Sequence, residues 1–280
     1  MIIDTHLHLI YRNRLSYPWL KSIESLNKDA RYEDYQRTAR RVGITGALHM
    51  EVDVADDDRD AETDLVRSLM DSPHSLIRGA IASCRPESDE FPAWLDMQLH
   101  RKEVKGLRRV LHVMPDELST SAVFRDNVKR LSGTGLTFDL CVLPAQIPLA
   151  IELVDYCPEV PFILDHCGVP DIKGGDFAAW SQQIAGISKR HNVTGKISGV
   201  MAYTDTDHWT LEDIRPYVER TIKEFGWDRV IWGSDSPVCT LGGHLETWVA
   251  ATQALLMHCS AEEKNQLLHR NASALWNIPS

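Results

Sequence analysis

The sequence predicts an α/β fold with one domain, a (β/α)₈ barrel of the TIM-barrel type over residues 1–280. Eight short apolar segments alternate with amphipathic segments along the whole chain. Their starts, from residue 1 to residue 229, are spaced by about 33 residues on average, and a barrel of about 250 residues needs about 31 per unit. A doubly wound open sheet alternates in the same way and is the alternative fold. No internal repeat, low-complexity tract or linker interrupts the pattern, so we expect no domain boundary.

Each apolar segment has the length of a buried strand. The expected strands are residues 1–7, 44–52, 75–83, 104–113, 136–143, 161–168, 193–199 and 229–236. Between them the apolar spacing becomes helical. The clearest stripes are Ile214, Tyr217, Val218, Ile222 and Phe225; Phe177, Trp180, Ile184 and Ile187; and Leu65, Val66, Leu69 and Met70. The strongly apolar stretch 247–259 predicts another helix, and the longest gap predicts a long loop over residues 9–30.

Composition and charge exclude several classes of protein. The net charge of −10 argues against a nucleic-acid binder and against a protein that binds anionic membranes, because both favour basic surfaces. No stretch is long and apolar enough for a membrane span. The six cysteines form no CxxC pair and no signal peptide is visible, so we expect a cytoplasmic protein with free, buried thiols. The expected partner is a small-molecule substrate, and the sequence is compatible with a homo-oligomer.

The polar residues at the ends of the expected strands predict an active site. In "MIIDTHLHLI", alternation places Asp4, His6 and His8 on one face of the first strand, and we expect that face to point into the barrel. His166 in "LDHCG" and Asp235 in "WGSDSP" end the sixth and eighth strands. Each has a simpler interpretation alone, His166 as a core histidine and Asp235 as a helix N-cap. Together, three histidines and a carboxylate are a common ligand set for Zn²⁺ or a similar ion.

Six motifs occur in a consistent order along the chain. They are "DTHLH", "YPWL", "GLRRVL", "FILDHCGVP", "VIWGSDSPV" and the ending "NASALWNI" at 271–278. This set resembles the amidohydrolase superfamily. Within it, the chain is similar to the amidohydrolase-2 branch, and within that branch to the group of sugar-acid lactonases and 2-pyrone-4,6-dicarboxylate lactonases. The resemblance implies a distorted TIM barrel that hydrolyses a cyclic ester.

The same resemblance assigns roles to the four polar residues. His6, His8 and His166 would line a metal or water site, and Asp235 would be the general base that activates the water. Superfamily members with two metals need further ligands on the third to fifth strands. The fourth expected strand here ends in "RRVLH" and the fifth contains "DLCVL", and neither matches that ligand pattern. We therefore expect at most one divalent ion, Zn²⁺ for preference, at His6, His8, His166 and Asp235. In the lactonase group that ion can be dispensable.

Other residues are candidates for binding the substrate. Arg108 matches the motif arginine, so the face with Arg108 and His112 should point into the barrel, where the guanidinium could hold a carboxylate through two hydrogen bonds. Arg109 should lie on the helix side. Four more candidates lie at strand ends or in the long first loop: Gln146, Glu51, Tyr17 and Trp19. Lys196 in "GKISG" is interpreted as a charged structural contact.

The sequence thus predicts a hydrolase that opens a small lactone, such as a sugar-acid lactone or a dicarboxylate lactone, by attack of water on the ester carbonyl. One alternative is a metal-dependent nonoxidative decarboxylase of an aromatic or muconate-type acid, although such enzymes usually carry another histidine near the fifth strand. A lactone isomerase without metal is a second alternative. A non-catalytic barrel used as a binding scaffold is the third, and the four polar residues argue against it.

Overall fold

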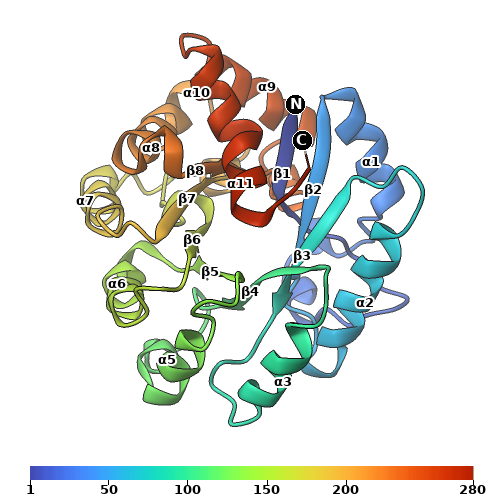
Figure 1. Cartoon of the computed structure of the whole chain (residues 1–280). Helices are drawn as coiled ribbons and strands as arrows, with labels where there is room; N and C mark the ends of the chain where they lie inside the picture. The colour runs from blue at the N-terminus through green and yellow to red at the C-terminus, as the bar shows by residue number, and fades with distance from the viewer. Residues whose placement is uncertain (280) are drawn as a thin grey trace.

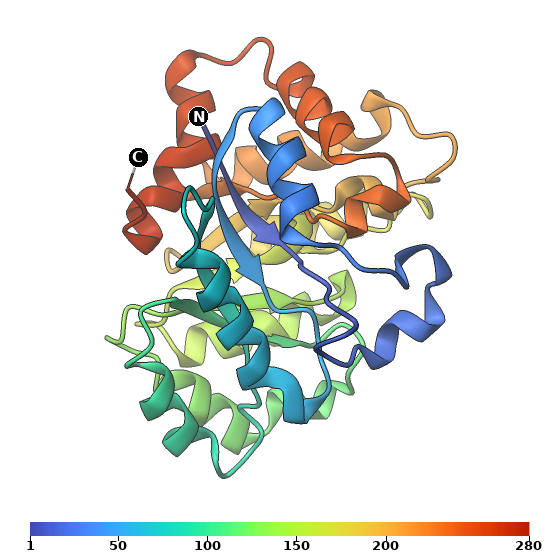
Figure 2. The same ribbon diagram turned by 90° about the vertical axis from the view of Figure 1, so that its right-hand side faces the viewer.

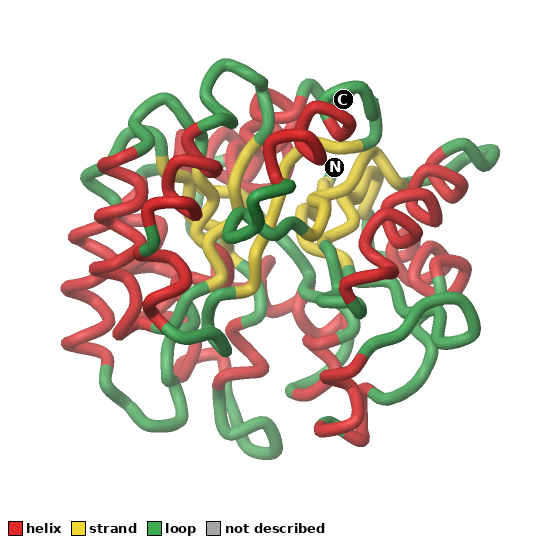
Figure 3. The backbone as a smooth tube through the Cα atoms, turned by 90° about the horizontal axis from the view of Figure 1, so that it is seen from below, coloured by secondary structure: helices red, strands yellow, loops and turns green. Residues whose placement is uncertain are grey.

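The computed structural model describes residues 1–279 and shows eight parallel strands joined in chain order. The strands lie in the middle of the molecule and the helices surround them (Figures 1 and 3). A parallel bridge between Leu7 and Ser236 connects the end of β1 to the segment after β8 and closes the barrel. The barrel prediction is therefore confirmed and the open sheet is excluded. The strands are β1 (Ile2–Leu7), β2 (Ile44–Met50), β3 (Ile77–Ser83), β4 (Val104–Val110), β5 (Thr137–Cys141), β6 (Phe162–Leu164), β7 (Val193–Ile197) and β8 (Val230–Trp232).

The helices cover the outer face of the barrel, and the predicted apolar stripes face the strands. All five stripe residues of α8 are buried, whereas Phe177 of α7 is partly exposed and Leu69 and Met70 of α2 are only half-buried. The helices are α1 (Tyr32–Arg41), α2 (Arg59–Met70), α3 (Phe91–Gln98), α4 (Asp116–Thr120), α5 (Ala122–Lys129), α6 (Ile147–Tyr156), α7 (Phe177–Ile187), α8 (Leu211–Phe225), α9 (Leu245–Leu255), α10 (Ala261–Asn265) and α11 (Asn271–Trp276). None of the helices in residues 1–279 combines the length and the apolar character that a membrane span requires.

An apolar layer fills the barrel at the amino-terminal ends of its strands. It consists of strand residues that point inward, with two residues of α11 and the following Ile278 packed beneath them: Ile3, Leu48, Met50, Ile81, Ile163, Ile231, Ala272, Trp276 and Ile278. Figure 1 shows α11 in front of the strands at this end. Because this end is closed by hydrocarbon, polar groups of the barrel interior collect at the opposite, carboxyl ends of the strands, where active sites of this fold lie.

The prediction that Asp4 shares the inner face with His6 is wrong. Ile3 belongs to the inner apolar layer, whereas Asp4 accepts hydrogen bonds from the Tyr35 hydroxyl of α1 at 2.7 Å and from the backbone N–H of Ser234 at 2.7 Å. The register between β1 and β2 shifts between Asp4 and Leu7. This irregularity breaks the simple alternation, so that Asp4 points towards the helices and His6 points inward.

Residues 9–30 form the predicted long loop after β1. An antiparallel bridge between Ile10 and Ala30 closes it, and two short 3₁₀ helices, Pro18–Ser22 and Glu24–Leu26, lie inside it. Figure 2 shows this dark blue segment at the end of the barrel to which the β1 arrow points. The loop therefore lies over the carboxyl ends of the strands.

The prediction of free cysteines is confirmed. All six thiols are unpaired, and five are buried, whereas Cys259 is partly exposed.

Candidate active site

The structure brings together the four polar side chains that the sequence singled out. His6 lies near the end of β1, His8 directly follows β1, and His166 and Asp235 follow β6 and β8. Nε2 of His6 and Nε2 of His8 are 3.2 Å apart. Oδ1 of Asp235 lies 3.5 Å from Nε2 of His8, and Oδ2 lies 3.9 Å from Nδ1 of His166. All four side chains are buried, so they form one compact polar cluster.

The backbone is strained where it supplies two of these side chains. His166 and Asp235 adopt φ values of +53° and +57°, in the left-handed region that residues other than glycine rarely occupy. Gly199 lies against both: a Cβ atom there would come within 2.6 Å of Nδ1 of His166 and 2.8 Å of Oδ2 of Asp235. Strain of this kind is concentrated at functional sites. The fold therefore accepts unfavourable backbone conformations to hold these two groups.

The histidines are held as neutral imidazoles. Nδ1 of His8 is 3.0 Å from the carbonyl oxygen of Met50, and because a carbonyl only accepts, Nδ1 carries the proton. Nδ1 of His166 is 2.9 Å from the Ser198 hydroxyl. Burial lowers the pKa of His8 to about 3 and lowers the pKa of His6 well below its usual value. Nε2 of His8 therefore presents a lone pair to the cluster.

Asp235 has no hydrogen-bond partner for either carboxylate oxygen among the described residues, although it is buried. Burial raises its pKa to about 6. His6, His8 and Asp235 each offer one ligand atom, and these atoms lie within 4.8 Å of one another. Two imidazole nitrogens in close contact and an unpaired carboxylate fit a divalent cation between them. The residues present therefore suit a single catalytic zinc site, which needs three protein ligands and one open position.

His166 lies beside this group rather than inside it. It combines with His6 and Asp165 in a second possible ligand group, and its ring centroid is 4.3 Å from that of His6. Asp165, however, is already bound to Lys196 at 2.7 Å. The group of His6, His8 and Asp235 is thus better suited to a metal ion.

A buried network of charges lies below and beside the cluster. Nε of Arg108 donates to Oε1 of Glu51 at 2.6 Å, and Nη2 donates to the backbone carbonyl of Glu51 at 2.7 Å. Nη1 of Arg108 lies 3.4 Å from both Oδ2 of Asp165 and Nε2 of His6. Although burial alone would raise the pKa of Glu51, Arg108 lowers it. Glu51 is therefore a fixed counter-charge for Arg108.

Lys196 is the other cation of this network. Its ammonium group donates to Asp139 at 2.6 Å and to Asp165 at 2.7 Å, and it lies 3.4 Å from Nδ1 of His6. Burial raises the pKa of Asp139 to about 7, whereas Lys196 keeps the pKa of Asp165 well below its usual value despite burial. The sequence interpretation of Lys196 as a charged structural contact agrees with these bonds. Asp139 and Asp165 were missed, although Asp165 directly precedes His166 in "LDHCG".

A cavity of about 370 Å³ opens above the cluster. Its inner end is formed by His8, Arg108, His166 and Asp235. Of the predicted substrate-binding residues, His112 and Trp19 also line it, and Trp19 is fixed by a hydrogen bond from Nε1 to the carbonyl of Val52 at 2.7 Å. Further lining comes mainly from apolar residues: Ile23, Leu26, Val52, Val110, Val113, Ala202, Val238 and Leu241.

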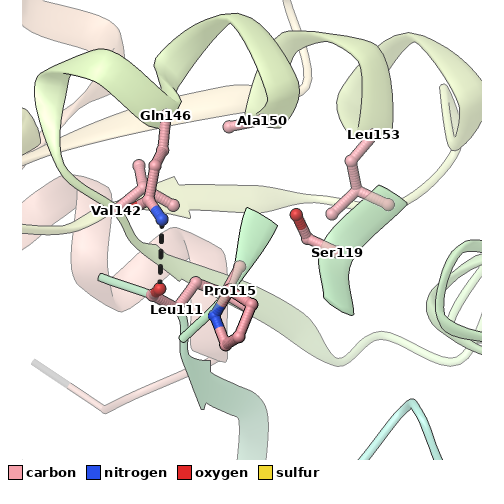
Figure 4. Close-up of a pocket in the computed structure, with 7 residues that line it drawn as sticks. All are labelled: Leu111, Pro115, Ser119, Val142, Gln146, Ala150 and Leu153. Carbon is pink, nitrogen blue, oxygen red and sulfur yellow. Dashed lines mark hydrogen bonds between the residues drawn. The ribbon is translucent and has the colours of Figure 1, made fainter. Parts of the chain in front are cut away.

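Three other candidates lie outside this cavity lining. Glu51 is held by Arg108, and the Tyr17 hydroxyl accepts a hydrogen bond from the backbone of Tyr11 at 3.0 Å. Gln146 lies against a separate small pocket, where its amide donates to the carbonyl of Leu111 at 3.3 Å (Figure 4). Its position differs from the expectation that it faces the substrate, because its side chain ties the start of α6 to the neighbouring loop.

Glu51 occupies one edge of the Arg108 guanidinium, the edge formed by Nε and Nη2. Two parallel hydrogen bonds to a substrate carboxylate would therefore have to come from Nη1 and the second N–H of Nη2. Arg109 points elsewhere, as expected, and its Nε donates to Glu87 at 2.9 Å. Arg108 thus belongs to the cavity floor, and Nη1, whose contacts with Asp165 and His6 are long at 3.4 Å, is its least tightly bound nitrogen.

Comparisons with known proteins agree with this architecture. An amidohydrolase family model matches residues 3–278. L-fucono-1,5-lactonase from Burkholderia ambifaria is 25% identical over 86% of this chain and 82% of its own length. 2-Pyrone-4,6-dicarboxylate hydrolase from Comamonas testosteroni is 29% identical over 53% of this chain and 50% of its own.

A solved structure, an amidohydrolase from Burkholderia multivorans with bound zinc, superposes with a TM-score of 0.89 at 20% identity over 100% of both chains. The predicted resemblance, and with it the enzyme class, a hydrolase, is confirmed. Because the family model spans nearly the entire chain, the protein belongs to the amidohydrolase family.

Proposed function

We propose that this protein is a lactonase that opens the ring of a small lactone with Asp235 as the general base. The observation that carries the proposal is the buried Asp235 carboxylate, which has no hydrogen-bond partner within residues 1–279 and faces the cavity beside three imidazoles. A raised pKa, about 6, suits a group that must both accept and return a proton near neutral pH. The relatives that act on lactones support the choice of a cyclic ester.

In the proposed reaction, Asp235 removes a proton from a water molecule at one of its free oxygens. The hydroxide adds to the lactone carbonyl carbon, and Nη1 of Arg108 stabilises the negative charge that develops on the carbonyl oxygen. The bond between that carbon and the ring oxygen then breaks, and Asp235 returns its proton to the leaving oxygen. The product is a hydroxy acid, which ionises and releases one proton.

His6, His8 and Asp235 would hold a divalent ion, with His166 beside them. When bound, such an ion lowers the pKa of a coordinated water and polarises a carbonyl. The solved relative that contains zinc supports this choice of metal. The chain's own contribution is to keep the imidazoles neutral and oriented through Met50 and Ser198.

A panel of lactones assayed with a pH indicator tests the proposed function. Hydrolysis releases acid, whereas isomerisation of the ring releases none and decarboxylation releases CO₂. Acid release from at least one lactone, absent in the Asp235→Asn variant, is the expected result. CO₂ release from an aromatic acid with no lactone turnover would replace the lactonase with the decarboxylase. The β5 sequence TFDLC, which contains no histidine, argues against that outcome.

Arg108→Met should lower kcat/KM by about 10- to 150-fold, because a hydrogen bond to a charged group contributes roughly 1.5–3 kcal/mol. Arg109→Met is the matched control and should leave kinetics nearly unchanged, since that side chain pairs with Glu87 outside the cavity lining. Steady-state kinetics on both variants, with circular dichroism to check folding, decides the point. Equal losses in the two variants would remove the role of Arg108 in the reaction.

Purified protein should bind at most about one equivalent of Zn²⁺. The double variant His6→Ala, His8→Ala should lose this binding, because Asp235 would be the one ligand left of the three that a zinc site needs. His112→Ala is the control: it lines the same cavity but lies outside the ligand group, so it should keep its metal. Elemental analysis measures the stoichiometry. Two tightly bound equivalents would contradict the single site.

Hydrolysis should depend only partly on that ion. A lactone is a reactive ester, so a carboxylate base and an arginine should sustain measurable turnover after treatment with a chelator. Complete loss of activity, restored only by Zn²⁺ or Mn²⁺, would show an obligately metal-dependent reaction instead.

A further inference from the structure

The outer part of the cavity is an apolar wall built from three separate loops. Ile23 and Leu26 come from the loop after β1, Val113 from the segment after β4, and Val238 and Leu241 from the segment after β8. Val113 is 67% exposed, so an apolar side chain stands in water at the cavity rim. Covering such a surface with hydrocarbon is favourable, and covering it with hydroxyl groups is costly unless each finds a partner.

Several polar groups near this wall already have partners. Nδ1 of His112 is 3.2 Å from the Cys141 thiol, and the Asp53 carboxylate is 3.7 Å from Nη2 of Arg85. The Ser22 hydroxyl donates to the backbone of Trp19 at 2.7 Å. Tyr203 is a further polar residue of a lining that is mainly apolar, so a ligand with many hydroxyl groups would find only a few polar partners there.

The charges of the cavity do not favour an anionic ligand either. In the part of the chain that the structure describes, Arg108 is the only arginine or lysine in the cavity lining, and its Nε is 2.6 Å from the Glu51 carboxylate, which balances its charge. Lys196 is shared between Asp139 and Asp165 and lies outside the lining. A substrate carboxylate would therefore meet a single cation, whose charge is already balanced by Glu51 and whose Nε–Nη2 edge is already occupied.

We infer that the substrate is a neutral lactone with an apolar substituent, rather than a polyhydroxylated or an acidic lactone. The inference rests on the proposed lactonase function. The ester carbonyl lies at the inner end, near Asp235 and Arg108. The substituent projects outward along the apolar wall, against Ile23 and Val113.

A series of δ-lactones with alkyl chains of increasing length tests this inference. Each added methylene should raise kcat/KM by about fourfold until the wall is covered, which corresponds to about 0.8 kcal/mol per buried CH₂. Gluconolactone and a carboxylated δ-lactone of similar size should react more slowly than the longer alkyl lactones. Faster turnover of either comparison compound would overturn the inference and leave the lactonase function standing.

Val113→Ser combined with Ile23→Ser should flatten the dependence of kcat/KM on chain length. Val123→Ser is the control, because Val123 is an exposed valine of α5, 43% exposed, outside the cavity. An unchanged chain-length dependence in the double variant would show that the wall does not contact the substituent.

Calorimetric binding separates this inference from the proposed function. The Asp235→Asn variant keeps the wall intact, so it should bind the longer alkyl lactones more tightly than the shorter ones, even without turnover. If binding depends on chain length but the unmodified protein hydrolyses none of these lactones, the lactonase function is rejected and the inferred ligand class is kept. Binding that is independent of chain length would reject the ligand class.

Discussion

Replacing Asp235 with asparagine should reduce lactone turnover at least about 100-fold, because a positioned general base contributes roughly 10²–10⁴-fold. Asparagine keeps the shape of the side chain and cannot take up the proton of the attacking water. The measurement is kcat on the best lactone of the panel, at a pH well above 6, where the wild-type carboxylate is ionised.

The folded state should tolerate this change. Burial raises the pKa of Asp235, which means that the ionised carboxylate opposes folding near neutral pH, so removal of the charge should not lower the melting temperature of metal-stripped protein. Asp53→Asn is a suitable control, since Asp53 lines the same cavity but belongs to neither possible ligand group. Wild-type turnover by a folded Asp235→Asn protein would reject Asp235 as the base.

Lys196→Met should lower the free energy of unfolding by about 3–5 kcal/mol, because removal of one partner leaves buried charges without compensation. Asp139 and Asp165 both depend on this ammonium group, at 2.6 Å and 2.7 Å, and all three side chains are fully buried. Urea denaturation of metal-stripped protein measures the loss. Activity should fall as well, since Lys196 and Asp165 flank Nδ1 of His6.

Lys173→Met is the matched control. Lys173 also forms an ion pair, at 3.3 Å with Asp205, but its side chain is 67% exposed. Exposed pairs of this kind contribute only about 0–1 kcal/mol. If both lysine variants lost the same small amount of stability, the buried network would not be a determinant of folding.

All eight strands and their arrangement in a barrel could be predicted from the sequence. Buried parallel strands are continuous apolar runs, and the segments between them show the apolar spacing of helices. The face of β1 was predicted only in part. His6 and His8 point into the site, but a register shift after Asp4 breaks the alternation on which the prediction relied. Such a shift depends on how β1 pairs with β2, and the sequence of β1 by itself does not reveal that pairing.

The buried network was missed for a related reason. Asp139 stands in an apolar strand, and its partner Lys196 is 57 residues away in the sequence, so only closure of the barrel brings them together. Gln146 shows the opposite case, since its position after β5 suggested the substrate site. Local bonds to Leu143 and Asp116, at 2.9 Å each, turn its side chain away. Strand ends locate an active site from sequence, whereas the direction of each side chain depends on its neighbours.

The division between the apolar wall and the polar cluster has a consequence for how this enzyme could diversify. The cluster is fixed at the strand ends, whereas Ile23 and Val113 lie in loop segments that contribute no residue to it. Val238 differs, because it shares the segment after β8 with Asp235, whose backbone carbonyl accepts a hydrogen bond from Cys239 at 2.7 Å. Mutant libraries restricted to positions 23 and 113 should therefore yield variants with altered ligand preference at little risk to the chemistry. Gene duplicates that drift at the same positions would acquire new substrates by the same route, with the barrel and its base inherited intact.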